Sequence, residues 1–348
     1  MRAPIILTLA GAAMAGTLGF SRYQSAHHFN PVVELLAAHK TVLGLYAPAN
    51  PRAGGGRRGG APPAADAPPP PPPPPAKSQA ELAQQALGYN LADFTFSGSM
   101  EGDLDRAFPE FVEYMKGLTT AGDPTKTPFP HLALPMIVKT HKISENRPLA
   151  AERIGRQLNE GVVGIMFPET ESAEDVRVGL AAMRFKSNGG TRPDNVGDAP
   201  ARWGMSEKEY KEKADLWPLN PKGELINWTI VESKEGLAHI REIAAVPGIG
   251  VLWPGAGTLR GVFTNTVDGK RVFDQAGWEG AIQQVLAACK EFKVPCGFPS
   301  NEGDIEMRAK QGFSVFVMNW GEPGQRTIVL GRQVSGRKDG DTGLTYQP

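Results

Sequence analysis

Short, continuously apolar runs alternate with amphipathic segments along most of the chain. Such runs are typical of strands that are buried on both faces of a parallel sheet. Segments between them repeat their apolar residues at helical spacing, and Ser172 and Ser233 supply start signals for two of these helices. The predicted strands are Val42–Tyr46, Phe94–Ser97, Met136–Thr140, Val162–Phe167, Trp228–Glu232, Val251–Trp253, Val294–Phe298 and Val315–Asn319. The predicted helices include Leu104–Leu118, Ser172–Phe185, Ser233–Val246 and Trp278–Phe292.

This alternation predicts an α/β fold of the (β/α)8 TIM barrel type, extending from about Asn30 to Arg332 within a single domain of residues 27–348. A doubly wound open sheet is the alternative architecture. No GxGxxG motif follows the first predicted strand, which disfavours a dinucleotide-binding protein.

Two insertions interrupt the pattern. Ala47–Lys77 is rich in glycine and proline and ends in eight consecutive prolines, so we expect a disordered insertion at residues 48–80. A docking ligand for a proline-binding domain is the alternative. The second insertion, Lys186–Leu225, is far longer than the two to six residues usual at such a connection. It predicts either a cap over an active site or a subunit contact, with a helix at Ser206–Ala214.

The first residues have the pattern of a targeting segment. Arg2 precedes an uncharged apolar run of 17 residues, Pro4–Phe20, which is shorter than the about 20 residues that a bilayer-spanning helix needs. Residues 1–26 are therefore expected to be a signal peptide, with an uncleaved N-terminal anchor as the alternative. Either predicts an exported protein, in a periplasm or at a membrane face.

Composition excludes several classes of function. Lys and Arg total 37, as do Asp and Glu, so the net charge is zero, and no nucleic-acid partner is expected. The only cysteines, Cys289 and Cys296, are too few for a disulfide framework or a cysteine-based zinc module. They could still pair in an oxidising compartment.

Candidate chemistry lies where the predicted strands end, because the catalytic groups of a barrel follow the carboxyl ends of its strands. These positions hold Glu101, Lys139, His141, Glu169 and Glu232. Glu232 and Lys139 directly end apolar strands, where a charged group is costly unless it binds something. Carboxylates suit Mg²⁺ or Mn²⁺. The glycine-rich stretch Gly255, Ala256, Gly257, Thr258 offers backbone N–H groups for an anion.

Two longer stretches carry a family resemblance. NEGVVGIMFPETESAEDVRVGLAAMRF and IVESKEGLAHIREIAAVPGIGVLWPGAGTL, with GGTRP between them, resemble motifs of the metal-dependent 2-oxo-acid aldolases of the HpcH/HpaI type, relatives of the citrate lyase beta subunit. The order and spacing of the motifs also agree. The resemblance implies a TIM barrel of the pyruvate/phosphoenolpyruvate-binding type. It also implies a homo-oligomer whose subunits exchange their last helices.

The resemblance further implies pyruvate-enolate chemistry at a divalent metal. Glu232 matches the metal-binding glutamate, and Glu169 is the substitute predicted for the second metal ligand, because Thr258 stands where the family has aspartate. Lys139 matches the arginine that neutralises the oxyanion. Glu101 matches the acidic residue beside the family's histidine, whose own position is Gly102, so His141 is the expected replacement.

We therefore predict a carbon–carbon lyase of aldolase type with an altered active site, acting on a 2-oxo acid and an aldehyde. The predicted catalytic residues are Lys139, His141 and Glu101; the substrate-binding residues are Gly255 to Thr258; and the metal ligands are Glu232 and Glu169. The alternative is an exported, non-catalytic descendant that binds a small acid.

Overall fold

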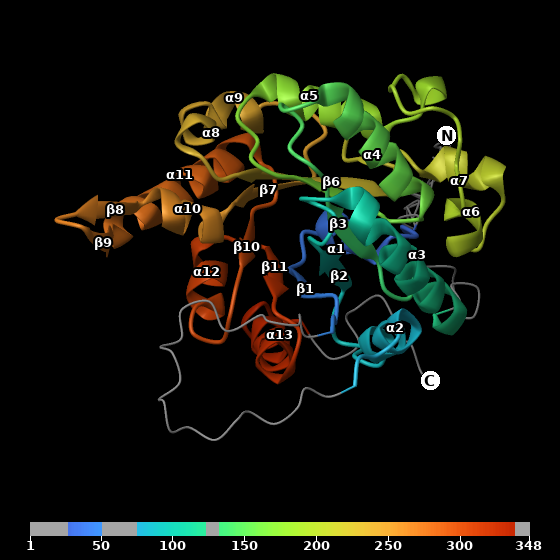
Figure 1. Ribbon diagram of the computed structural model, residues 1–348, viewed down its shortest axis with the longest axis horizontal. Helices are drawn as coiled ribbons and strands as arrows, with labels where there is room; N and C mark the ends of the chain where they lie inside the picture. Colours follow the sequence, from blue (N-terminus) through green and yellow to red (C-terminus); the bar gives the residue numbers. More distant parts are fainter. Residues whose placement is uncertain (1–26, 51–74, 123–131, 338–348) are drawn as a thin grey trace, which may run out of the picture.

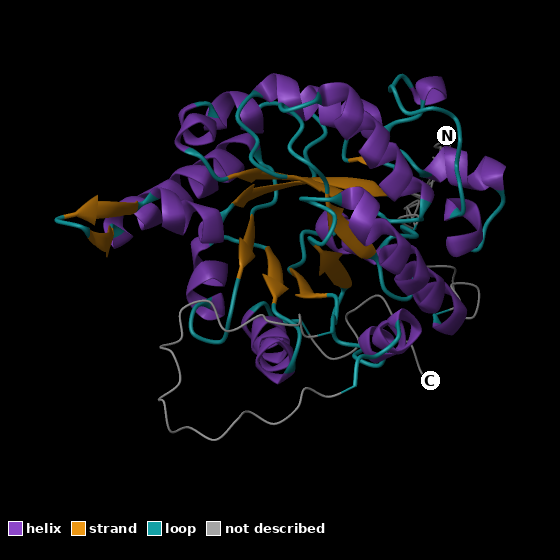
Figure 2. Ribbon diagram, viewed as in Figure 1, coloured by secondary structure: helices purple, strands orange, loops and turns teal. Residues whose placement is uncertain are grey.

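A computed structural model describes residues 27–50, 75–122 and 132–337 of the 348-residue chain. Eight parallel strands form its centre, and helices surround them (Figures 1 and 2). The eight strands are β1 (Val42–Tyr46), β2 (Phe94–Ser97), β3 (Met136–Lys139), β4 (Gly164–Phe167), β6 (Leu225–Val231), β7 (Val251–Pro254), β10 (Gly297–Pro299) and β11 (Val315–Met318). A two-residue strand, β5 (Leu216–Trp217), pairs with the start of β6, and β8 (Thr264–Val267) and β9 (Lys270–Phe273) form a hairpin that projects from the barrel (Figure 1).

Helices follow most of the strands and pack on the outside of the sheet. They are α1 (Pro31–Ala37), α2 (Gln79–Leu87), α3 (Leu104–Ala121), α4 (Arg147–Asn159), α5 (Ala173–Met183), α6 (Ala199–Arg202), α7 (Glu207–Lys213), α8 (Lys234–Ala238), α9 (Ile240–Ala244), α10 (Ala256–Val262), α11 (Gln275–Phe292), α12 (Ile305–Gln311) and α13 (Glu322–Val334). The predicted helix at Ser233–Val246 is two short helices, α8 and α9, which meet at His239.

The sheet curls until its two edges meet. Its order is β10-β11-β1-β2-β3-β4-β6-β7, and a parallel bridge between Leu252 of β7 and Cys296 joins the ends. Leu252 donates its N–H to the carbonyl of Pro295 at this seam. The predicted α/β barrel of eight parallel strands is confirmed, and the open sheet is excluded.

A disulfide bond lies beside the same seam. Cys289 near the end of α11 is bonded to Cys296, and both residues are buried. The bond ties a helix on the outside of the barrel to the strand that closes it. The two cysteines therefore meet, which the sequence alone left open.

Aromatic rings fill the inside of the barrel. Trp228 of β6 lies 5.1 Å from Phe94 and 6.1 Å from Phe96 of β2, and 5.2 Å from Trp253 of β7, measured between ring centroids. Strands β2 and β6 are not neighbours in the sheet, so these contacts cross the interior. The barrel is a packed core and not a pore, as this fold requires.

Two glycines make room for these rings. A methyl group added at Gly44 of β1 would lie 2.3 Å from the ring of Phe94, and one at Gly297 of β10 would lie 1.7 Å from the ring of Trp253. Both glycines are thus required by close packing, because any side chain there would overlap an aromatic ring.

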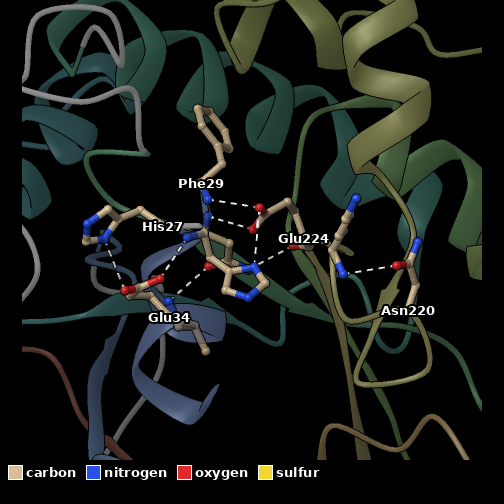
Figure 3. A network of polar contacts seen from close by, with 9 residues as sticks. His27, Phe29, Glu34, Asn220 and Glu224 are labelled. Carbon is tan, nitrogen blue, oxygen red and sulfur yellow. Dashed lines mark hydrogen bonds and ion pairs between the residues drawn. The ribbon is translucent and has the colours of Figure 1, made fainter. Parts of the chain in front are cut away.

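The insertion at residues 186–225 packs at the base of the barrel, where strands begin. Trp203 of this segment lies 5.3 Å from Phe29, and the carboxylate of Glu224 accepts the backbone N–H groups of Phe29 and Asn30, each at 2.9 Å. Figure 3 shows this network around Glu224. The prediction that this segment caps an active site at the carboxyl ends of the strands is therefore wrong. The segment connects a helix to the next strand, and such connections lie at the opposite end of the barrel, where the strands begin. The predicted helix at Ser206–Ala214 is confirmed as α7, with a capping box between Ser206 and Glu209.

The glycine- and proline-rich insertion lies mostly outside the described residues. Its described edges are joined, because the Asn50 side chain hydrogen-bonds the backbone of Lys77 in both directions, at 2.7 and 2.8 Å. Ser78 caps α2, so ordered structure begins before the predicted limit at residue 80. Residues 1–26, which carry the predicted targeting segment, also lie outside the described residues. Among the described helices, none is long and apolar enough to cross a membrane.

Candidate active site

A small cluster of charged side chains lies at the carboxyl ends of the strands. The Nζ atom of Lys139, the last residue of β3, is 2.7 Å from Oε1 of Glu101 and 3.6 Å from Oε1 of Glu232. The Glu232 and Lys139 side chains are 4% and 14% exposed, whereas that of Glu101 is 38% exposed. Three of the residues predicted from the sequence therefore meet at one place, although they come from three different strand ends.

Glu232 is held by backbone as well as by charge. It follows β6, whose seven residues are all buried, and its Oε1 accepts the N–H of Glu169 at 3.0 Å. Glu169 has a positive φ of 44°, an uncommon backbone conformation for a residue other than glycine. In this conformation the N–H of Glu169 is directed at Glu232, so Oε1 of the buried carboxylate receives a hydrogen bond.

Gly255 forms the wall on the other side of Glu232. A methyl group added at Gly255 would lie 2.3 Å from Cβ and 2.5 Å from Oε2 of Glu232. Only glycine leaves the carboxylate this space. Close approach is the role of Gly255, since its φ of −72° is open to any residue.

The electrostatics of the cluster favour an ammonium ion at Lys139. Burial alone lowers the pKa of Lys139, but the charge of Glu232 and the hydrogen bond to Glu101 outweigh it, and the pKa is raised above its ordinary value. Burial also raises the pKa of Tyr46 at the end of β1, where Glu101 and Glu232 add to the effect and Lys139 opposes it. At neutral pH the cluster therefore presents an ammonium and an un-ionised phenol.

Sequence reasoning missed Tyr46. It ends β1 as Lys139 ends β3, it is 38% exposed, and its ring packs edge-on against Phe96 at 5.1 Å. Its position at the end of an apolar strand was a signal for a site residue. An aromatic residue at that position is equally typical of the hydrophobic core.

His141 lies beside the cluster. Its Nδ1 is 3.3 Å from the carbonyl oxygen of Glu101, and its Nε2 is 2.8 Å from the carboxylate of Glu145. Both partners are hydrogen-bond acceptors, so whichever ring nitrogen carries the hydrogen donates to one of them.

The stretch Gly255 to Thr258 is not an open loop. Gly255 precedes α10, and Ala256, Gly257 and Thr258 form its first turn. First-turn N–H groups have no acceptor within their own helix, so an anion remains a suitable partner for them. Thr258 is exposed, whereas Ala256 is buried.

The residues present do not fit a divalent metal at Glu232. The carboxylate of Glu169 is turned to Lys142, at 3.4 Å, and is 47% exposed, and the carboxylate of Glu101 is bound by the ammonium of Lys139. Across the described ranges, no three His, Cys, Asp or Glu side chains are grouped so that they could hold a metal ion. Mg²⁺ is bound through carboxylate oxygens in near-octahedral geometry. The expected pair of ligands, Glu232 and Glu169, instead meets through a backbone N–H.

Two cavities lie near the two ends of the barrel, and neither is lined by Glu101, Lys139 or Glu232. One of about 290 Å³ adjoins the mouth, between α2, α3 and the ends of β1 and β2, and is lined by Ala47, Ser97 and Tyr114 among others. Another, of about 560 Å³, lies at the base and is lined by Leu36, Trp217 and Val294 among others. The larger of these two cavities would place the candidate site at the base of the barrel. The charged residues with altered pKa values lie at the mouth, where the catalytic groups of this fold are found.

Solved structures settle the architecture. An HpcH/HpaI aldolase from Desulfitobacterium hafniense DCB-2 superposes with a TM-score of 0.57 at 14% identity, covering 90% of this chain and 98% of the other. An HpcH/HpaI aldolase/citrate lyase family protein from Burkholderia cenocepacia J2315 gives a TM-score of 0.50 at 20% identity, covering 73% and 87%. This chain has the HpcH/HpaI aldolase fold. The resemblance noted from the sequence motifs is thus confirmed at the level of the fold.

One curated relative supports the resemblance in sequence. A 2-dehydro-3,6-dideoxy-6-sulfogluconate aldolase from Pseudomonas putida is 27% identical over 157 residues, which is 45% of this chain. The match spans about half of that aldolase, 55% of its length. No protein-family profile matches the chain. The citrate lyase beta subunit of Mycobacterium tuberculosis, solved with oxaloacetate and magnesium, superposes with a TM-score of only 0.43, too distant to place either ligand here.

Proposed function

We propose that this protein is a carbon–carbon lyase of aldolase type that cleaves a hydroxylated 2-oxo acid into a smaller 2-oxo acid and an aldehyde. The observation that carries the proposal is the Lys139 ammonium, held between two carboxylates at the mouth of a barrel with the HpcH/HpaI aldolase fold. A fixed positive charge stabilises the negative charge that develops on the keto oxygen of a 2-oxo acid during cleavage.

The chain's own residues supply the parts of such a reaction. Glu101 is the more exposed carboxylate and takes the proton of the substrate hydroxyl. The bond between C3 and C4 then breaks, C4 becomes the aldehyde carbon, and the electron pair of the bond moves through C3 and C2 onto the keto oxygen. An N–H of Lys139 donates to that oxygen.

Proton delivery completes the reaction. The enolate takes a proton at C3, and we assign its delivery to His141, the imidazole beside the cluster. Glu101 releases its proton to solvent, and His141 regains one there. Hydroxy-2-oxo acid is thus converted to aldehyde and 2-oxo acid with no oxidant or reductant.

We assign the substrate carboxylate to the start of α10. The first-turn N–H groups of α10, at Ala256 to Thr258, follow Gly255, which contacts Glu232 directly. A carboxylate there would lie on the Gly255 side of Glu232, and the Lys139 ammonium lies 3.6 Å from the same glutamate. Export of the protein and assembly into a homo-oligomer remain predictions, and the proposed reaction does not depend on either.

The test is a cleavage screen on 4-hydroxy-2-oxo acids, with pyruvate release coupled to lactate dehydrogenase and oxaloacetate release to malate dehydrogenase. We expect turnover by the wild type and a loss of about a hundredfold or more for Glu232→Gln, since Glu232 holds the Lys139 ammonium and a misplacement of about 1 Å costs about that much. Glu306→Gln is the matched control, because the Glu306 side chain on α12 is exposed and pairs only with Lys310 among its described contacts. Saturable binding of pyruvate without any turnover would favour the small-acid-binding alternative.

A further inference from the structure

We propose that the ammonium of Lys139, and not a divalent metal, is the working cation of this site. The inference rests on the proposed function and adds how the site holds its substrate: the ligand is a free 2-oxo acid bound without an ion between it and the protein.

The position of Lys139 is the first observation. Its Nζ lies 2.7 Å from Glu101 and 3.6 Å from Glu232, so the space that a cation would occupy between these carboxylates is taken. A second cation placed there would meet a positive charge at contact distance and within a poorly exposed cluster, where repulsion is strong.

The state of Glu232 is the second observation. Its Oε1 accepts the N–H of Glu169 and faces Lys139, and its Oε2 lies against Gly255. Oε1 is therefore engaged by the protein on two sides. A metal bound at this oxygen would have to displace the N–H of Glu169 or the ammonium of Lys139.

The supply of other ligands is the third observation. Glu169, the carboxylate predicted to replace the missing aspartate, pairs with Lys142 at 3.4 Å, and Lys142 also pairs with Glu171 at 3.0 Å. In the described part of the chain no group of three suitable ligands exists. A second ammonium thus neutralises the acids that follow β4.

An ammonium ion can supply the positive charge that the keto oxygen needs during cleavage. Lysine carries a compact charge with three N–H donors. Among the described residues, Lys139 has two carboxylate partners, so one N–H is left for the keto oxygen of the substrate. The ammonium can hold an enolate oxygen as a metal would, by charge and by one directed contact.

Binding measured without turnover tests this assignment. The probe is oxalate, a dianion shaped like the pyruvate enolate, titrated by calorimetry into full-length protein that has been stripped of metal and kept in EDTA. We expect saturable binding to the wild type, unchanged by added Mg²⁺ or Mn²⁺, and metal analysis well below one ion per chain. Lys139→Met should weaken oxalate binding about tenfold to a hundredfold, the loss expected for one hydrogen bond to a charged group.

Two further variants keep the result decisive. Lys139→Arg retains the charge and should recover part of the affinity, which a purely structural role of Lys139 would not predict. Lys310→Met removes an exposed lysine of α12 and should bind oxalate as the wild type does. If Lys139→Met is unfolded by circular dichroism, the comparison of wild type with Lys139→Arg and with added metal still decides.

The outcomes separate this inference from the proposed function. Lys139-dependent oxalate binding in EDTA supports the inference even where no substrate is cleaved. Cleavage or oxalate binding that requires a divalent ion overturns the inference while the lyase proposal stands. A wild type that binds oxalate neither with nor without metal also overturns it.

Discussion

Replacing Gly255 with alanine is the sharpest test of how Glu232 is held. Gly255 has a φ of −72°, so alanine brings no backbone strain. Its methyl group would nevertheless lie 2.3 Å from Cβ and 2.5 Å from Oε2 of Glu232. The substitution thus acts on one neighbour, which is itself the buried carboxylate of the site.

The size of the effect follows from these distances. Non-bonded carbon atoms are at their best separation about 3.5–4.0 Å apart, so Glu232 or the start of α10 must move by more than about 1 Å. Overpacking of this kind costs about 1–3 kcal/mol of stability. A misplacement of about 1 Å in a catalytic arrangement lowers the rate about a hundredfold. We therefore expect Gly255→Ala to lose far more activity and oxalate affinity than its stability loss explains.

The assay compares this variant with Gly261→Ala in the same helix, where an added methyl group meets nothing within 4 Å. Both are measured by urea unfolding, oxalate calorimetry and the coupled cleavage assay. Gly261→Ala should be as stable as the wild type or more so, with unchanged binding. If Gly255→Ala binds oxalate and turns over as Gly261→Ala does, Gly255 is not the wall that positions Glu232, and the reasoning fails.

Two further predictions concern the seam and the charge of the site. Cys289→Ser breaks the disulfide and should lower the free energy of unfolding by about 2 kcal/mol, because closing so short a loop saves about that much chain entropy. Reductant should have the same effect on the wild type, as measured by urea titration. Because the pKa of Lys139 is raised in the folded protein, its pairing with Glu101 and Glu232 stabilises the fold fully below the ordinary lysine value of about 10.5 and is lost as the pH rises through the folded pKa. Oxalate affinity should accordingly stay level from about pH 6 to 9 and fall only above that window, whereas a fall near pH 7 would show that another group carries the charge.

The barrel was predictable because its strands are buried on both faces. A strand that contacts helices outside the barrel and side chains inside it must be apolar at nearly every position. The resulting apolar run, such as Val42–Tyr46, can be recognised in the sequence. The boundaries of β1 and β2 agree with the prediction. Closure between Leu252 and Cys296 was not visible, since one bridge carries no periodic signal.

Part of the site was predictable for a related reason. Glu232 and Lys139 stand out because a charged residue ends an apolar strand, and the structure brings their side chains together. Glu169 shows the limit of this reasoning. Its position after β4 was correct, but the direction of its carboxylate depends on a positive φ and on the attraction of Lys142, neither of which a strand pattern encodes.

The long insertion shows a different limit. Its length was evident, yet which face of the barrel it covers depends on the partner it meets. That partner is the segment before α1, whose backbone N–H groups at Phe29 and Asn30 are bound by Glu224, far away in the sequence. Long-range pairing of this kind leaves no local pattern to read.

The aromatic rings inside the barrel also bear on how the chain folds. Phe94 and Trp228 come from strands far apart in the sequence that share no hydrogen bonds, so no pairing of adjacent strands can bring their rings together. They meet only when the sheet between them has curled, after the entropy of closing a long loop has been overcome. The contact between Phe94 and Trp228 is therefore an event of barrel closure, whereas the stacking of Trp228 on Trp253 needs only that β6 pairs with β7.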